Sequence, residues 1–98
     1  MAIMDISIVP LGTGTTGVGR YIVEIHRILK DMGVPHALHD MGTTIEGEVE
    51  GLLEIARALH EVPFGMGVQR VYTVIKLDDR RDERVHLGEK ARRVTEAP

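Results

Sequence analysis

Two short segments carry the residues best suited to chemistry, and the first is rich in glycine and threonine. Residues 12–17 read Gly-Thr-Gly-Thr-Thr-Gly, the glycine spacing of a dinucleotide-binding loop between a strand and a helix. A dinucleotide-binding domain needs more parallel strands than this chain supplies, and no Lys follows the glycines as in a P-loop. We therefore interpret the segment as a flexible turn whose hydroxyl and backbone N–H groups can meet a polar ligand atom or an anion.

The second segment is a short polar strand, residues 43–47, which reads Thr-Thr-Ile-Glu-Gly. Because side chains alternate along a strand, Thr44 and Glu46 point to the same face. Glycines flank the segment, and they permit close approach of a ligand or of another backbone. Two interpretations stay open: Glu46 binds a polar ligand, or it caps the helix that follows.

The remaining polar residues do not form a catalytic or metal-binding pattern. His36 and His39 are three residues apart on a predicted strand and so point to opposite faces, and we interpret all five histidines as structural or solvated. Ser7 is the sole serine and lies in mid-strand, so no Ser/His/Asp arrangement is visible. The absence of cysteine excludes disulfides, thiolate catalysis and Cys-based metal sites. We expect no catalytic residue, no metal and no cofactor.

One hydrolase deserves comparison, because Gly17-Val18-Gly19-Arg20 resembles the phosphate loop of acylphosphatases. In that family the Arg lies one position further along, and an Asn holds the attacking water. This chain contains no Asn. An acylphosphatase-like hydrolase is therefore the least favoured alternative function.

Hydrophobic periodicity predicts the elements that position these segments. Apolar residues alternate along a first strand and a last strand, and they recur every three or four residues along two helices. In chain order we predict a strand, helix, strand, strand, helix and strand over residues 3–11, 18–32, 34–41, 43–46, 48–61 and 68–77. Thr16 is the expected N-cap of the first helix, Gly33 its stop, and Pro63 helps to break the second helix. A short helix is plausible in the charged tail, where Glu89 and Arg93 are four residues apart.

This order predicts a single α+β domain over residues 1–98 with a ferredoxin-like βαββαβ fold. Two right-handed crossovers give an antiparallel four-stranded sheet with both long helices on one face. The other face stays uncovered in a monomer, and a partly apolar bare face favours a homo-oligomer. We expect it to contribute an oligomer interface, together with charged residues late in the last strand and just after it; these interface residues are Ile3, Val9, Tyr72, Val74, Lys76 and Arg80.

The composition argues against two classes of binding partner, nucleic acid and membrane. A formal net charge of −3, two Tyr, one Phe and no Trp argue against nucleic acid, which attracts basic surfaces and stacks on aromatic rings. The N-terminus shows neither the basic nor the long apolar region of a signal peptide, and no apolar run is long enough to cross a membrane. We therefore expect a cytoplasmic protein without a membrane partner.

Three longer stretches carry a family resemblance. They are Ile8-Val9-Pro10-Leu11-Gly12-Thr13-Gly14, then Met41-Gly42-Thr43-Thr44-Ile45-Glu46-Gly47, then Arg70-Val71-Tyr72-Thr73-Val74-Ile75-Lys76-Leu77-Asp78-Asp79-Arg80-Arg81-Asp82. In this order they resemble the YkoF-like thiamine-binding family of small archaeal, bacterial and fungal proteins. The resemblance implies a ferredoxin-like fold, sheet-to-sheet dimers that commonly form tetramers (dimers of dimers), and a pocket for thiamine or its hydroxymethylpyrimidine part.

The resemblance also suggests where the ligand binds. We expect a non-enzymatic small-molecule site built from the glycine-rich loop and the short polar strand, within one subunit or between subunits; its residues are Pro10, Leu11, Gly12, Thr13, Thr15, Thr16, Thr44 and Glu46. Glu46 would accept a hydrogen bond from the exocyclic amine and complement the cationic charge of thiamine. Where family members often have Ser/Pro/Ser-type residues after Gly14, this chain continues Thr-Thr-Gly-Val-Gly. The alternative is a structural or regulatory oligomer with a vestigial pocket.

Overall fold

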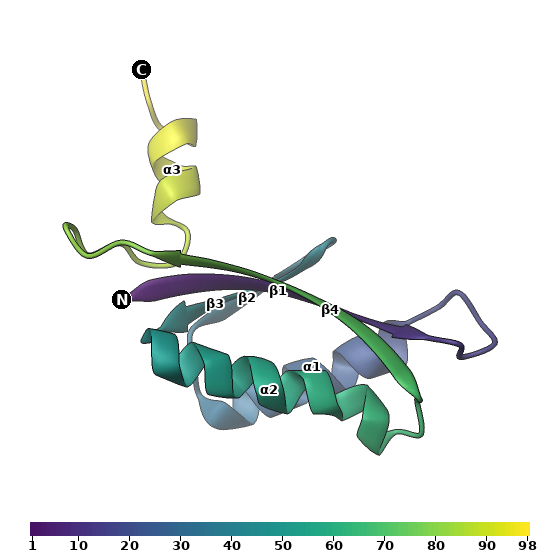
Figure 1. Cartoon of the computed structure of the whole chain (residues 1–98). Helices are drawn as coiled ribbons and strands as arrows, with labels where there is room; N and C mark the ends of the chain where they lie inside the picture. Colours follow the sequence, from purple (N-terminus) through teal and green to yellow (C-terminus); the bar gives the residue numbers. More distant parts are fainter.

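The computed structural model describes all residues 1–98 and shows one four-stranded antiparallel sheet in the order β2-β3-β1-β4. Figure 1 shows the two long helices together on one face of the sheet, with the short C-terminal helix on the other side. The predicted ferredoxin-like α+β fold is confirmed. The elements are β1 Ala2–Leu11, α1 Gly19–Met32, β2 His36–His39, β3 Gly42–Gly47, α2 Val49–Gly65, β4 Arg70–Asp79 and α3 Glu89–Thr95.

The core forms between the sheet and the two long helices. Alternate residues of β1 (Ala2, Met4, Ile6 and Ile8) are buried against the helices. Leu29 of α1, Ile45 of β3, and Leu52 and Leu59 of α2 complete the core, and none of these four side chains is exposed. Each large aliphatic side chain buried in this way stabilises the fold by about 1.5–3 kcal/mol. The opposite face of the sheet, which we call the open face, carries Ile3, Asp5, Ser7 and Val9 of β1.

Two prolines lie inside regular elements, and the second does not end its helix where the sequence predicted. Pro10 lies inside β1 opposite Val71 of β4, and the strand continues to Leu11. A proline is tolerated there because β1 has a strand on only one side beyond Ile6. Pro63 lies in the last turn of α2, where the helix continues to Gly65 and the proline ring is fully buried. Its burial offsets the lost hydrogen bond near a helix end.

The start of α1 also differs from expectation. Val18, and not Thr16, occupies the N-cap position, and no side chain caps the helix. The threonines stabilise the preceding loop instead: the Thr13 hydroxyl donates to the Thr15 carbonyl, and the Gly17 N–H donates to the Thr15 hydroxyl. At the other end Gly33 adopts the left-handed conformation with φ 69°, which confirms the predicted stop.

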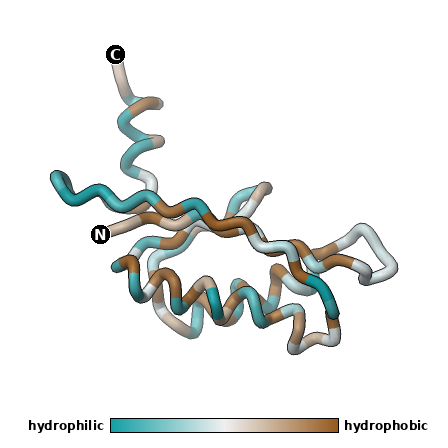
Figure 2. Tube along the Cα trace, in the orientation of Figure 1, coloured by the Kyte–Doolittle hydropathy of each residue, from teal (hydrophilic) through white to brown (hydrophobic).

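The tail after β4 is charged and held by ion pairs. Figure 2 shows a continuous hydrophilic stretch where β4 gives way to the tail. Arg80 binds Asp82 and Arg81 binds Asp79, and the hydrogen bonds from Arg80 hold the pKa of Asp82 below its usual range. Lys90 at the start of α3 pairs with Asp78 of β4. No helix of the chain is both long and apolar enough to cross a membrane.

Candidate functional site

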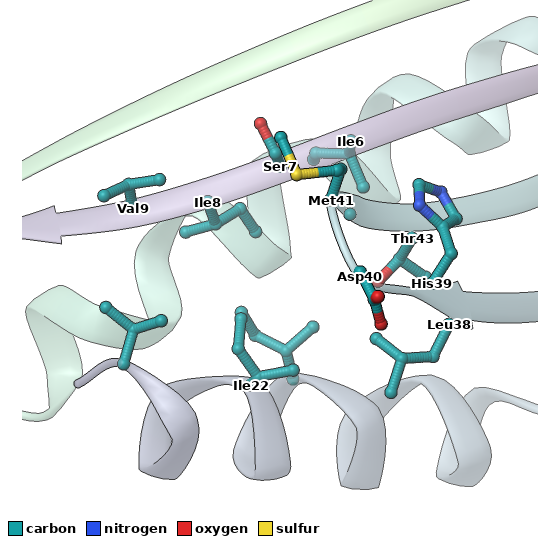
Figure 3. Close-up of a pocket in the computed structure, with 13 residues that line it drawn as sticks. Ile6, Ser7, Ile8, Val9, Ile22, Leu38, His39, Asp40, Met41 and Thr43 are labelled. Atoms are coloured by element: carbon teal, nitrogen blue, oxygen red, sulfur yellow. The ribbon is translucent and has the colours of Figure 1, made fainter.

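A cavity of about 170 Å³ opens between β1, α1 and the turn that joins β2 to β3. Figure 3 shows its lining, with Ile8 and Val9 on the strand side, Ile22 on the helix side, and the turn closing one end. Eight of its thirteen lining residues are hydrophobic. Sites for drug-sized ligands usually have volumes of roughly 300–1,000 Å³, so this cavity suits a single ring.

The cavity exists because the paired strands differ in length. β1 has ten residues, whereas β3 has six and β2 has four. Pairing between β1 and β3 runs from Ala2 to Ile6 and then stops at Thr43. Beyond that point β1 has no strand on this side, so some of its backbone N–H and C=O groups lack a partner there. These groups offer a donor and acceptor edge to a bound molecule.

Four of the lining residues have polar side chains, and two of these, Ser7 and His39, point to the open face; the four are Ser7, His39, Asp40 and Thr43. The Nε2 atom of His39 is 2.9 Å from Oδ1 of Asp5 and 3.2 Å from the Thr44 hydroxyl, and these contacts fix the imidazole ring. Asp40 is exposed and takes part in none of the ion pairs of the chain. Its carboxylate is therefore free to accept a hydrogen bond or to complement a positive charge.

A second histidine supports the cavity from the helix side. His26 of α1 lies 3.3 Å, through its Nε2 atom, from the hydroxyl of Thr43, a buried lining residue. Burial, with a smaller contribution from nearby His36, lowers the pKa of His26 below its usual 6.5. A neutral His26 is the form that fits this half-buried position. As predicted, His36 and His39 point to opposite faces: the His36 ring lies tilted against the His26 ring with 5.3 Å between their centres, and His39 contacts Asp5 on the open face.

The predicted ligand residues lie at two distant places in the subunit. Residues 12–16 follow the carboxyl end of β1, whereas Glu46 pairs with Ile3 near its amino end. Eight residues of extended strand separate Ile3 from Leu11, which is about 27 Å. Thr44 lies between them, opposite Asp5 on the open face. One subunit therefore does not bring the loop and Glu46 together.

Glu46 anchors the tail of its own chain. Its side chain is only 8% exposed, and its Oε1 atom accepts a hydrogen bond from Nδ1 of His86 at 2.8 Å and from the Leu87 N–H at 2.9 Å. Val85, the residue before His86, is buried. The alternative that Glu46 caps α2 is wrong, since the N-cap is Glu48 and no side chain caps that helix.

The glycine-rich loop borders a separate, more polar hollow of about 300 Å³. Gly12 and Gly14 have φ values of 74° and 79°, a conformation that favours glycine. Leu11, Gly12 and Thr13 line this hollow, and Thr15 and Thr16 are exposed in the loop beyond it. Arg20 also lines it, donates to the Tyr21 hydroxyl at 2.7 Å and lies over the Tyr21 ring. Pro10 instead is buried and faces the helices.

The residues expected at an oligomer interface mostly share the open face. The β1–β4 register puts Ile3, Val9, Tyr72, Val74 and Lys76 on that face. Tyr72 is 61% exposed, whereas Ile3 is half-buried. Arg80 lies just beyond β4 and binds Asp82 and Glu83 of its own chain.

Sequence reasoning did not identify Ser7, His39 and Asp40 as neighbours of one cavity. The available signal was a mismatch in length, since the strand predicted over residues 3–11 is longer than the strand predicted over residues 43–46. No group of three or more His, Asp or Glu side chains is arranged to hold a metal ion.

Comparison with known proteins adds to this geometry. The family model described as thiamine-binding protein matches residues 4–95. The chain belongs to the thiamine-binding protein family. The match covers the cavity, the polar strand and the tail anchor alike.

Individual relatives are similar to this chain over nearly their whole length. YqgV of Bacillus subtilis is 40% identical over 94 residues, which cover 92% of this chain and 90% of that protein. A Methanothermobacter thermautotrophicus protein is 36% identical over 97 residues, 98% of each chain. The crystal structure of MJ1052 from Methanocaldococcus jannaschii has a TM-score of 0.86 at 26% identity, covering 97% of this chain and 96% of that chain.

A further likeness concerns the fold alone. A Thermotoga maritima protein, whose name assigns it provisionally to thiamine biosynthesis or salvage, has a TM-score of 0.78 at 17% identity. The match covers 95% of this chain and 97% of that chain.

Proposed function

We propose that this protein binds thiamine, or its hydroxymethylpyrimidine part, without catalysing a reaction. The single observation that supports this proposal best is the ring-sized apolar cavity beside the unpaired edge of β1. Membership of a family described as thiamine-binding points to the same class of ligand.

The chemistry of an aminopyrimidine fits this cavity. Its flat ring suits a slot between the apolar side chains of β1 and those of Val18, Ile22 and Ile25. A ring nitrogen beside an exocyclic amine presents an acceptor next to a donor, which matches the N–H and C=O groups of an unpaired strand edge. The ligand would replace, over a short distance, the strand that β1 lacks.

The charge of the ligand also fits this site. Thiamine is a cation, and Asp40, whose carboxylate forms no ion pair in the subunit, is one of the residues that line the cavity. Asp40 would accept a hydrogen bond from the amine or complement the positive charge of the second ring. The second ring exceeds the volume of the cavity, so in this arrangement it projects outward.

The test is a calorimetric titration with thiamine and with hydroxymethylpyrimidine. Asp40→Asn keeps the size of the side chain and removes its charge, and a lost charge-assisted hydrogen bond costs about 1.5–3 kcal/mol. We expect the dissociation constant for thiamine to rise about 10- to 150-fold. Asp31→Asn is the matched control, because it removes one exposed carboxylate at the far end of α1, which pairs with Arg27.

Two results would contradict the proposal. If neither ligand gives a heat of binding, the cavity does not bind thiamine or its hydroxymethylpyrimidine part. Equal losses of affinity in Asp40→Asn and Asp31→Asn would mean that only the net charge of the protein matters. In the first case the alternative, a structural or regulatory oligomer with a vestigial pocket, becomes the better description.

We also propose that the protein is a homo-oligomer that uses the open face. Val9 and Val74 are 39% and 38% exposed there, beside the more exposed ring of Tyr72. A domain of this size buries a modest share of its surface alone, and covering these side chains would add to its stability. Light scattering at micromolar concentration measures the state, and a monomer would contradict the proposal.

A further inference from the structure

A hollow of about 300 Å³ lies where β1 ends and β4 begins, lined by residues 11–13, 20–21 and 66–69; we call it the loop hollow. Leu11 pairs with Arg70, so the glycine-rich loop after β1 and the turn from α2 to β4 lie at the same end of the sheet (Figure 1). The cavity proposed for thiamine borders the turn from β2 to β3 instead, and β1 lies between β3 and β4 in the sheet. The two sites share no lining residue, so the loop hollow is a separate candidate site.

The only full charge in the lining of the loop hollow is positive. Arg20 is its one charged residue, and no Asp or Glu lines it. The first acid along α1 is Glu24, and it binds Arg27 instead of Arg20. Arg20 forms no ion pair with any carboxylate of the chain. In a protein with a net charge of −3, the hollow thus carries an uncompensated cation, which favours an anionic ligand.

Tyr21 holds the side chain of Arg20 in place. Nη2 of Arg20 donates to the Tyr21 hydroxyl at 2.7 Å, and the guanidinium lies 4.7 Å from the centre of the Tyr21 ring. Because Tyr21 is only 2% exposed, it fixes the guanidinium before a ligand arrives and leaves most of its N–H groups free. The Tyr21 hydroxyl accepts this hydrogen bond but donates to no atom of the chain. A buried hydroxyl normally finds an acceptor for its hydrogen, and a ligand oxygen in the hollow would provide one.

The glycine-rich loop adds backbone donors to the same hollow. The N–H groups of Gly12 and Thr13 form no hydrogen bond within the chain. Gly12 has a φ of 74°, and successive N–H groups around a left-handed residue form a concave donor surface that suits an anion. The Thr13 hydroxyl is already used, since it donates to the Thr15 carbonyl. Donors from the loop and from α1 therefore line a hollow that has no acidic side chain.

We propose that the loop hollow binds the phosphate group of a small molecule, either inorganic phosphate itself or a phosphate monoester. The oxygens of a phosphate group point in tetrahedral directions, so they accept from donors on different elements at once, whereas a carboxylate accepts close to one plane. The same donors and the positive charge disfavour a cation such as thiamine. Phosphate binding is therefore separate from the thiamine site and does not depend on that proposal.

A calorimetric titration of the full-length protein with inorganic phosphate tests the site, at constant ionic strength because salt screens exposed charges. Arg20→Gln removes the positive charge, and we expect the dissociation constant for phosphate to rise about 10- to 150-fold. Tyr21→Phe keeps the ring beside the guanidinium but removes the hydroxyl donor, and it should raise the constant about tenfold. Arg92→Gln is the matched control, because it removes the charge of an exposed arginine of α3 outside the hollow and should have no effect.

The same titration with thiamine monophosphate and with thiamine distinguishes the two sources of the phosphate group. If Arg20→Gln weakens the monophosphate but not thiamine, the hollow holds the phosphate group of an ester. If the loss is confined to inorganic phosphate, the hollow holds the free anion. Both results support the proposal, and a protein that fails to bind thiamine leaves the phosphate test unchanged.

Two results would overturn the phosphate site. The first is that neither phosphate compound binds saturably, or that Arg20→Gln and Arg92→Gln lose affinity equally, which would show an effect of net charge alone. The second needs no variant and so holds even if a variant fails to fold. Phosphate added to the unaltered protein should shift the amide NMR signals of Gly12 and Thr13 and leave that of Met41, beside the thiamine cavity, in place. Unshifted Gly12 and Thr13 signals would refute the assignment.

Discussion

Replacing Glu46 by Gln distinguishes two roles for the least exposed carboxylate of the chain. The sequence predicted that Glu46 binds the ligand, whereas in the structure Glu46 accepts hydrogen bonds from His86 and from the Leu87 N–H. Glu46→Gln keeps the size of the side chain and one acceptor oxygen but removes the charge. If the tail anchor is its main role, the tail loosens and thiamine binding stays unchanged.

The size of the effect follows from the two hydrogen bonds to Oε1. A hydrogen bond to a charged group contributes about 1.5–3 kcal/mol and a neutral one about 0.5–1.5 kcal/mol, so the change costs about 1 kcal/mol per bond. His86 is 51% exposed, and water screens its share. We therefore expect local opening of the tail to become easier by about 1–2 kcal/mol. This free energy corresponds to a 5- to 30-fold change, by the usual factor of about ten per 1.4 kcal/mol.

Hydrogen exchange of the Leu87 amide measures this opening. Its rate should rise about 5- to 30-fold in Glu46→Gln, while amides in the core of β1 keep their protection. Glu48→Gln is the control, because that side chain is 77% exposed and lies two residues away. Calorimetry with thiamine completes the comparison.

Two outcomes decide between the roles. An unchanged Leu87 exchange rate in Glu46→Gln would refute the anchoring argument. A loss of thiamine affinity with intact tail protection would instead return Glu46 to the ligand site, completed by a neighbouring subunit.

Two more predictions concern His26 and Gly42, which support or line the cavity. Because the pKa of His26 is lowered on folding, the unfolded chain binds more protons than the folded chain. The free energy of unfolding should therefore keep its full value above about pH 6.5 and decrease as the pH drops through the folded pKa. His26→Gln should flatten this dependence in urea titrations at pH 5–8. Gly42→Ala should destabilise the fold by about 1–3 kcal/mol, because the added Cβ would lie 2.8 Å from the Ile6 carbonyl oxygen. Gly51→Ala is the control: the position is exposed on a helix with open space around it, so this variant should be neutral or stabilising. Urea unfolding of both variants measures the difference.

The sequence by itself determined the fold and the faces of its strands. Apolar alternation in β1 and β4 fixes which side chains meet the core, because the period of a strand is two and a slip would reverse every side chain. The same rule placed Thr44 and Glu46 on one face and separated His36 from His39. Local signals were weaker where burial competes with them, as at Pro63, whose buried ring outweighs its tendency to break a helix.

Tertiary structure alone decided what lies next to these residues. Glu46 meets His86 across forty positions of sequence, and no local pattern carries such a contact. The cavity depends on where pairing with β3 stops along β1, at Ile6, and this point is fixed only when the strands assemble. A side chain's face follows from local backbone geometry, but its neighbours follow from strand register and packing between distant segments. For this reason the sequence placed Glu46 on the correct face while leaving its partner undetermined.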